Sequence, residues 1–246
     1  MCRVPEVSRL AFPPAVRTLA GLWAGLVDLV TSLALLGLGV AAWAPSQDLP
    51  WTPLRLGEPL SWATDLKFAA ALRDPQRCRA VLREGGVSFS EAPSRRDGDC
   101  TVRNALRPGG GAVPLSPAAP VMTCAEALGY AFWTRHVVQP AAREHLGREV
   151  ARIDHYGTYA CRDIRGGHMM SQHASANALD VAGFRLQGGA RVSVRGDFRR
   201  DDRRGRFLRQ SRDGACRWFR AVLSPDYDAA HADHLHLDQG FWGKCQ

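Results

Sequence analysis

The sequence predicts an α+β fold, in which a small antiparallel sheet with flanking helices is preceded by one N-terminal transmembrane helix. Three observations predict it: a long apolar run near the N-terminus, helical patterns in the middle of the chain, and alternating apolar and polar residues towards the C-terminus. We divide the 246 residues into a cytoplasmic N-terminus (1–18), a membrane segment (19–43), a tether with a lead-in helix (44–75) and one folded domain (76–246).

The membrane segment runs from Leu19 to Trp43 and is long enough to span a bilayer as a helix. Three arginines precede it, so the positive-inside rule leaves the N-terminus in the cytoplasm and places the rest of the chain in the periplasm (Arg3, Arg9 and Arg17). A cleaved signal sequence is the alternative, because Ala42 and Ala44 resemble a cleavage site, and the protein would then be secreted. We favour a single-pass inner-membrane anchor, since the apolar run exceeds the roughly 7–15 residues of a signal sequence.

The part of the chain after the anchor alternates between irregular and helical patterns. Residues 45–60 hold four prolines and little periodicity, which predicts an extended tether. Short helices are expected over Ser61–Leu72 and Gln76–Leu82. Residues 88–120 are rich in Ser, Gly, Pro and charge, which predicts a long surface connection.

A further helix begins at Thr123, which forms a capping box with Glu126. Its apolar positions continue to Val138, where Pro140 is expected to interrupt it, and a second short helix then runs to Gly147.

Strand patterns follow. Val150–Tyr159 alternates, and Ala178–Leu186 and Ala190–Val194 flank a Gln-Gly-Gly turn, which predicts a β-hairpin. Arg204–Leu223 suits an amphipathic helix that tolerates Gly214, and His234–Leu237 is typical of a short strand.

Seven cysteines are present, of which Cys2 precedes the anchor. The other six lack the close spacing of a structural zinc site, so for an exported domain they predict three disulfides (Cys78, Cys100, Cys124, Cys161, Cys216 and Cys245). We expect Cys78 to pair locally with Cys100, and the other four cysteines stay open among their possible pairings.

Metal-ligating residue types gather in the C-terminal half. His173 is followed seven residues later by Asp180, and His234 and His236 lie near the C-terminus. On a strand, residues two apart share a face, so His234, His236 and Asp238 are expected to project together. Imidazole and carboxylate suit zinc, and three protein ligands with one open position are typical of a catalytic site. We expect one zinc ion, held by His173, Asp180 and His236.

These residues resemble a known family. The segments Ser171–His173, Ala178–Asp180 and His234–His236 resemble the zinc pattern of the D-alanyl-D-alanine metallopeptidases, the lysostaphin-type endopeptidases and the hedgehog fold. More closely, residues from about Cys78 to Cys245 resemble the bacterial extensin-like C-terminal domain proteins, on four segments (Tyr159–Arg162, Cys216, Pro225–Tyr227 and Asp233–Asp238).

The resemblance implies a hedgehog/DD-peptidase-like fold and roles for individual residues. His173, Asp180 and His236 would be the metal ligands and His234 a catalytic residue, while Asp233 stands where the peptidases have a glutamate base. Arg162 falls where those enzymes hold a substrate carboxylate, and we place Ser171 beside it as substrate-binding. Ala176 departs from the glycine that the peptidases usually have.

The expected function is zinc-dependent hydrolysis of a peptide bond in cell-wall peptidoglycan, which an anchored periplasmic domain can reach. The alternatives are a non-catalytic zinc-containing module that binds peptidoglycan or a protein partner, and a basic envelope scaffold. Lys and Arg exceed Asp and Glu by 32 to 24, and arginines are dense between Arg195 and Arg212. No aromatic platform accompanies them, so we interpret them as a solvated surface and expect no nucleic-acid partner.

Overall fold

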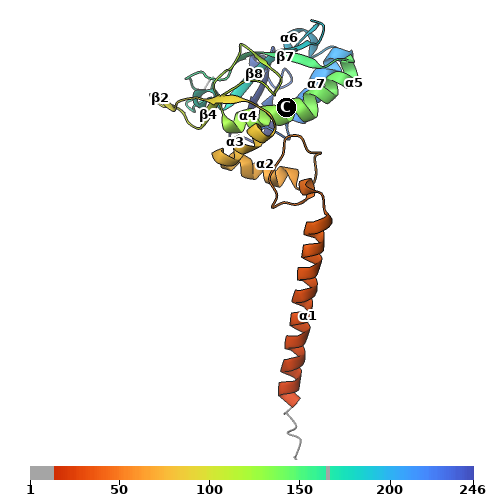
Figure 1. The fold of residues 1–246 in the computed structure, drawn as a ribbon. Coiled ribbons are helices and arrows are strands. Elements are labelled where there is room, and N and C mark those ends of the chain that lie inside the picture. Colours follow the sequence, from red (N-terminus) through yellow and green to blue (C-terminus); the bar gives the residue numbers. More distant parts are fainter. Residues whose placement is uncertain (1–13, 165–166) are drawn as a thin grey trace, which may run out of the picture.

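The computed structural model describes residues 14–164 and 167–246, and of residues 14–20 only the backbone. Cys2, Arg3 and Arg9 lie outside the described residues, whereas the backbone of Arg17 belongs to helix α1 (Pro14–Trp43). Helix α1 projects as a single rod with the folded domain at its C-terminal end (Figure 1). Over Gly21–Trp43 it is long and apolar enough to cross a membrane, and a signal sequence near the N-terminus would share these features.

The domain is mixed α+β, and its main sheet is larger than predicted. Seven strands form it, in the order β12-β10-β11-β8-β7-β5 with β9 paired to β8. Most pairs are antiparallel, but β5 runs parallel to β7 and β12 parallel to β10. The strands are β5 (Leu115–Ser116), β7 (Val150–Gly157), β8 (Ala178–Leu186), β9 (Arg191–Ser193), β10 (Ala221–Leu223), β11 (Leu235–Asp238) and β12 (Lys244–Cys245).

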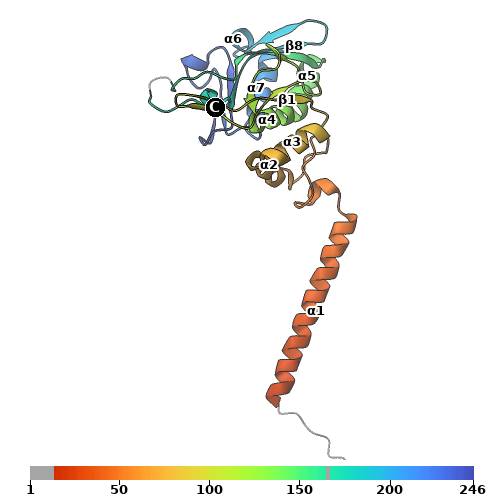
Figure 2. The same ribbon diagram turned by 60° about the vertical axis from the view of Figure 1, so that its left-hand side comes forward.

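Helices cover one side of this sheet and extend towards α1 (Figures 1 and 2). Their bounds are α2 (Thr64–Arg73), α3 (Pro75–Glu84), α4 (Cys124–Trp133), the π-helical turn η2 (Thr134–Val138), α5 (Gln139–Leu146), α6 (Val194–Asp197) and α7 (Arg203–Ala215). Trp133, Phe184 and Trp218 are among the largest fully buried side chains between helices and sheet. The helices predicted at Ser61–Leu72 and Gln76–Leu82 and the β8–β9 hairpin are therefore present, with small shifts at their ends.

The helix that begins with α4 is not broken at Pro140. Pro140 lies at the start of α5, and the π-helical turn before it lets α4 and α5 continue as one rod. The capping box at its beginning is half formed. Thr123 accepts the amide of Glu126, but the Glu126 side chain turns into the core instead of returning to the cap.

Residues 88–120 are mostly exposed, as their composition predicts, but they contain short strands instead of an irregular connection. They form β1 (Phe89–Glu91), β2 (Arg95–Asp97), β3 (Cys100–Val102), β4 (Ala105–Pro108) and β5, and β4 also pairs with β6 (Met122–Thr123). These strands are two to four residues long, so no periodicity develops within any of them. They are held by pairing with one another and with β6, while β5 pairs with the more distant β7.

The helix predicted over Arg204–Leu223 ends early. α7 stops at Ala215, and Ala221–Leu223 instead forms β10 between β11 and β12. Gly214, which looked unfavourable in a helix, has a packing role: a Cβ atom there would lie 2.4 Å from Cγ1 of Val137. The glycine therefore allows α7 to approach η2 closely.

The three disulfides are present, but the predicted Cys78–Cys100 pair is wrong. Cys78 bonds to Cys124, and the other bonds join Cys100 to Cys161 and Cys216 to Cys245. The reason is tertiary packing. α3 lies against α4, whose first residue is Cys124, and β3, whose first residue is Cys100, lies beside the 3-10 helix η3 (Gln172–Ser175). Sequence proximity therefore did not determine the partner of Cys78.

The predicted tether over residues 45–60 is also wrong, because this segment folds onto α2. The buried Lys67 ammonium donates to the carbonyl oxygens of Ser46 (2.9 Å) and Gln47 (3.3 Å) and to the Thr52 hydroxyl (2.8 Å). Three leucines of the segment are buried against the domain (Leu49, Leu54 and Leu56). An interior ammonium that uses all three of its donors holds the irregular backbone in place.

Candidate metal centre

Two neighbouring strands of the main sheet carry the first two ligand candidates. In the antiparallel pair β8–β11, Asp180 lies directly opposite His236. Side chains opposite each other in such a pair lie on the same face, about 4.5–5.5 Å apart at Cβ. Leu179 and Leu237, also opposite each other, point the other way and are fully buried. The alternation read from the sequence therefore orients both candidates towards one site.

The third candidate, His173, lies on the short 3-10 helix η3 (Gln172–Ser175) just before β8. Ser171 caps this helix, since its hydroxyl accepts the His173 amide at 3.3 Å. Ala176 ends it with φ of 55°, the left-handed conformation that favours glycine and costs other residues about 1 kcal/mol or more. Ala176 therefore adopts a backbone conformation that a glycine would take at lower cost.

The three side chains converge. Nε2 of His173 lies 3.2 Å from Oδ2 of Asp180 and 3.3 Å from Nδ1 of His236, and that Nδ1 lies 2.9 Å from Oδ1 of Asp180. One carboxylate and two imidazole nitrogens, aimed at one another in a largely buried place, are a donor set that suits zinc. The residues present therefore fit the expected ion.

Asp238 supports His236 from behind. Its Oδ2 lies 3.0 Å from Nε2 of His236, so both ring nitrogens of His236 face a carboxylate. Burial by itself would lower the pKa of His236, but hydrogen bonds to Asp180 and Asp238 raise it to about 9. Burial alone would raise the pKa of Asp180, but hydrogen bonds from His173 and His236 hold it far below its usual range. A carboxylate that fixes a ligand histidine in this way is typical of metal sites.

His234 lies at the edge of this group, paired with Asp233. Its Nδ1 is 2.9 Å from Oδ1 of Asp233, and its Nε2 is 3.5 Å from Oδ1 of Asp180. Because β11 begins only at Leu235, Asp233 is free of strand alternation and can turn towards His234. The exposed Tyr156 of β7 packs edge-on against His234 and its hydroxyl lies 3.4 Å from Oδ2 of Asp233. The hydrogen bond from His234 lowers the pKa of Asp233, which therefore stays ionised.

A second paired histidine adjoins the same group. Nδ1 of His231 lies 2.6 Å from Oδ1 of Asp228, the residue that caps the 3-10 helix η4 (Ala229–His231). The His231 ring is 5.2 Å from the His234 ring and 5.8 Å from the His236 ring, between ring centroids. Burial lowers the pKa of His231, which favours its neutral form. His231 therefore lies beside the candidate metal centre.

The comparison with known families gives one result. The family model described as Extensin-like protein C-terminus matches residues 76–246. This chain belongs to the extensin-like family. Searches of curated proteins and of solved structures found no match. The matched residues of the extensin-like domain contain all three ligand candidates and all six bonded cysteines.

The two predicted substrate-binding residues of the extensin-like domain are placed differently from the ligands. Arg162 is exposed, and among the described residues its guanidinium donates to the Asp163 carbonyl oxygen and makes no hydrogen bond or ion pair with a ligand candidate. Ser171 is nearly buried, and its hydroxyl is engaged in capping the helix that carries His173. The structure thus brings together five of the seven predicted site residues.

Sequence reasoning missed Asp228 and Tyr156, and it interpreted His231 as a bystander at the rim of the site. The Asp228–His231 pair had a sequence signal, because an aspartate is a favoured N-cap residue and can accept the backbone amide three residues later, here that of His231. Tyr156 had none, since its approach to Asp233 depends on how β7 and the loop before β11 come together.

Proposed function

We propose that the extensin-like domain is a zinc-dependent peptidase or amidase that hydrolyses a peptide bond of cell-wall peptidoglycan in the periplasm. The observation that carries the proposal is the convergence of His173, Asp180 and His236 beside the paired His234. Resemblance to the D-alanyl-D-alanine metallopeptidases supports the reaction class. An ion held by these three residues supplies Lewis-acid chemistry, which polarises a carbonyl group and makes water more acidic.

His234 and Asp233 have different roles in proton transfer. Asp233 holds the His234 ring by Nδ1, which leaves Nε2 directed at the site as the atom that accepts or returns a proton. Asp233 itself is a weak base, because its pKa is lowered. We therefore assign proton transfer to His234 and orientation to Asp233. His231, held by Asp228, supplies a second imidazole within reach of the same group.

A row of arginines supports an acidic peptide as substrate. Arg152, Arg185 and Arg191 surround the single carboxylate of Asp154, with N–O distances of 4.0, 3.2 and 3.3 Å. One carboxylate cannot neutralise three guanidinium groups, so this face of β7–β9 keeps a positive charge. The row lies on the strands that carry the site, since Arg185 shares β8 with Asp180 and Arg152 shares β7 with Tyr156. We infer that these arginines, in place of Arg162, bind the free carboxylates of a wall peptide.

The first test is metal content of the full-length protein with its disulfides intact. We expect about one zinc per chain, lost in His173→Ala and in His236→Ala and retained in His234→Ala. Incubation of the zinc-loaded protein with purified peptidoglycan should release new muropeptides, and His234→Ala should abolish that release. Stoichiometric zinc without cleavage would instead support a binding module, and no zinc would refute the proposal.

The arginine row is tested separately. Arg191→Ala should raise KM for a soluble wall peptide while zinc content stays at the wild-type level. The matched control is Arg77→Ala, at an exposed arginine of α3 that pairs with Asp74. An equal change in both variants would mean that the substrate responds to net charge and not to this row.

A further inference from the structure

Three exposed tryptophans surround the point where α1 meets the domain. Trp43, the last residue of α1, is 90% exposed, and Trp51 and Trp62 are each 66% exposed. We call this set the tryptophan collar. By contrast, Trp133 and Trp218 of the domain are fully buried. Exposed indoles so concentrated in one short segment call for a partner, because each buries a large apolar area when it is covered.

Hydrogen bonds bring the collar together. The turn after α1 is the 3-10 helix η1 (Ser46–Asp48). Trp51 precedes Thr52, which shares the Lys67 ammonium with the carbonyl oxygen of Ser46. Trp62 follows Ser61, whose hydroxyl donates to the carbonyl oxygen of Gln47 at 2.6 Å. Both indoles therefore flank the turn that leaves α1, and Trp43 lies just before it.

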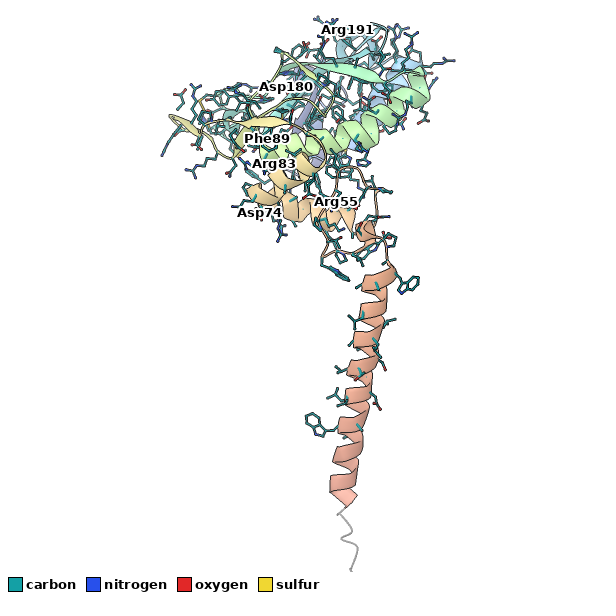
Figure 3. All side chains as sticks on the ribbon, in the orientation of Figure 1. Arg55, Asp74, Arg83, Phe89, Asp180 and Arg191 are labelled. Atoms are coloured by element: carbon teal, nitrogen blue, oxygen red, sulfur yellow. A yellow bond between two sulfur atoms is a disulfide. The ribbon has the colours of Figure 1, made fainter. Side chains whose placement is uncertain are left out.

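The collar is held rigidly to the domain. If residues 45–60 were a flexible tether, their mean end-to-end distance would be about 20–25 Å and the domain could take any height above the membrane. Instead, Lys67 holds the turn and Leu49, Leu54 and Leu56 anchor the segment in the domain. Figure 3 shows Arg55 of this segment at the end of the domain nearest α1, with Arg191 at the far end.

The chemistry of the segment identifies the partner. Residues 44–67 carry two basic side chains, Arg55 and the buried Lys67, against three acids (Asp48, Glu58 and Asp65), so anionic lipid would not attract them. Tryptophan does prefer the boundary between hydrocarbon and headgroups, where the ring is apolar on one side and its N–H is hydrated on the other. A neutral membrane interface at the end of α1 satisfies both conditions.

We propose that the tryptophan collar lies in the interfacial layer of the bilayer that α1 crosses, and that it seats the domain against the membrane surface. The proposal rests on α1 spanning that bilayer, and it is independent of zinc and of catalysis. Its consequence is that the candidate metal centre stays at a fixed distance from the membrane surface and acts on material close to the membrane.

The test is tryptophan fluorescence of the full-length chain in phosphatidylcholine vesicles, with and without acyl-chain bromination near the headgroup. The variants are Trp51→Phe and Trp62→Phe, and because both side chains are exposed, phenylalanine preserves the fold. Trp242→Phe is the matched control at a half-exposed tryptophan near the C-terminus, and Trp23→Phe reports on insertion of α1.

We expect brominated lipid to quench the fluorescence that each collar substitution removes, and to leave unquenched the fluorescence that Trp242→Phe removes. Addition of anionic phosphatidylglycerol should leave the quenching unchanged. If Trp51 and Trp62 are insensitive to brominated lipid but quenched by aqueous iodide, while Trp23 is lipid-quenched, the collar proposal is overturned. If Trp23 is also insensitive, α1 is not inserted and the proposal fails at its premise.

Discussion

Glu126 provides a quantitative test of the packing behind the candidate metal centre. Its carboxyl group is fully buried, and among the described residues neither oxygen has a hydrogen-bond partner. Burial raises the pKa of Glu126 well above its usual range, and the charges of Asp238 and Asp180 raise it further. The folded protein therefore keeps Glu126 protonated at pH values where the unfolded chain ionises it.

The sign of the effect follows from linkage. Below the unfolded pKa of about 4.3 both states hold the proton and the buried carboxyl costs nothing extra in stability. Above it, the unfolded state gains free energy from ionisation, so the free energy of unfolding falls by about 1.4 kcal/mol per pH unit until the folded pKa is reached. Glu126→Gln has no proton to keep. The variant should therefore gain stability over the wild type by that amount for each pH unit between about 5 and the folded pKa of Glu126.

The assay is guanidinium unfolding of the metal-free full-length protein in mild detergent, at several pH values between 4 and 7. Glu126→Leu is the control, since it has no polar atoms and should give the same slope. Unpaired amide atoms in Glu126→Gln add a constant offset that leaves the slope unchanged. A wild-type-to-variant difference that does not depend on pH would refute the buried, protonated carboxyl.

Three further predictions concern the metal centre and the disulfides. Hydrogen bonds to Asp180 and Asp238 outweigh burial and raise the pKa of His236 to about 9, so zinc must displace a proton from this ring. The affinity for zinc, measured in competition titrations, should therefore rise about tenfold per pH unit from 7 to 9 and then level off. Asp238→Asn should weaken zinc binding about 10- to 100-fold without loss of fold, measured against an indicator chelator; unchanged affinity would contradict its supporting role. Joint replacement of Cys78 and Cys124 by Ser opens a bond that spans 46 residues and should cost about 4 kcal/mol in denaturant unfolding, whereas an intact Cys78–Cys100 bond in peptide mapping would contradict the pairing.

The site could be predicted as far as it depends on residue type and strand alternation. Asp180 and His236 each stand in a strand between apolar neighbours, so their common face follows from a period of two. The contacts between residues around these two ligand candidates could not be predicted in the same way. Tyr156 reaches Asp233 from 77 positions away, and no pattern within either segment reports that contact.

Errors in the fold prediction share one cause. Composition favoured a loose tether over residues 45–60 and a loose connection over 88–120, but hydrogen bonds and strand pairing order both segments. Lys67 orders the first from 15 to 21 residues away, and β4 is held between β1 and β6 in the second. In short elements the local preference is weak, so tertiary contacts decide the conformation.

The sequence by itself determined the apolar helix, the hairpin, the α+β character and the types of the candidate ligands, because these depend on periodicity and on residue chemistry within short windows. The family followed from the resemblance of its motifs. Only the tertiary structure decided the partner of each cysteine, the seating of the segment after α1, and the contact of Tyr156 with Asp233 beside the candidate metal centre. Each of these depends on which distant segments meet. That choice is made by burial of the whole core, a free energy that no local window contains.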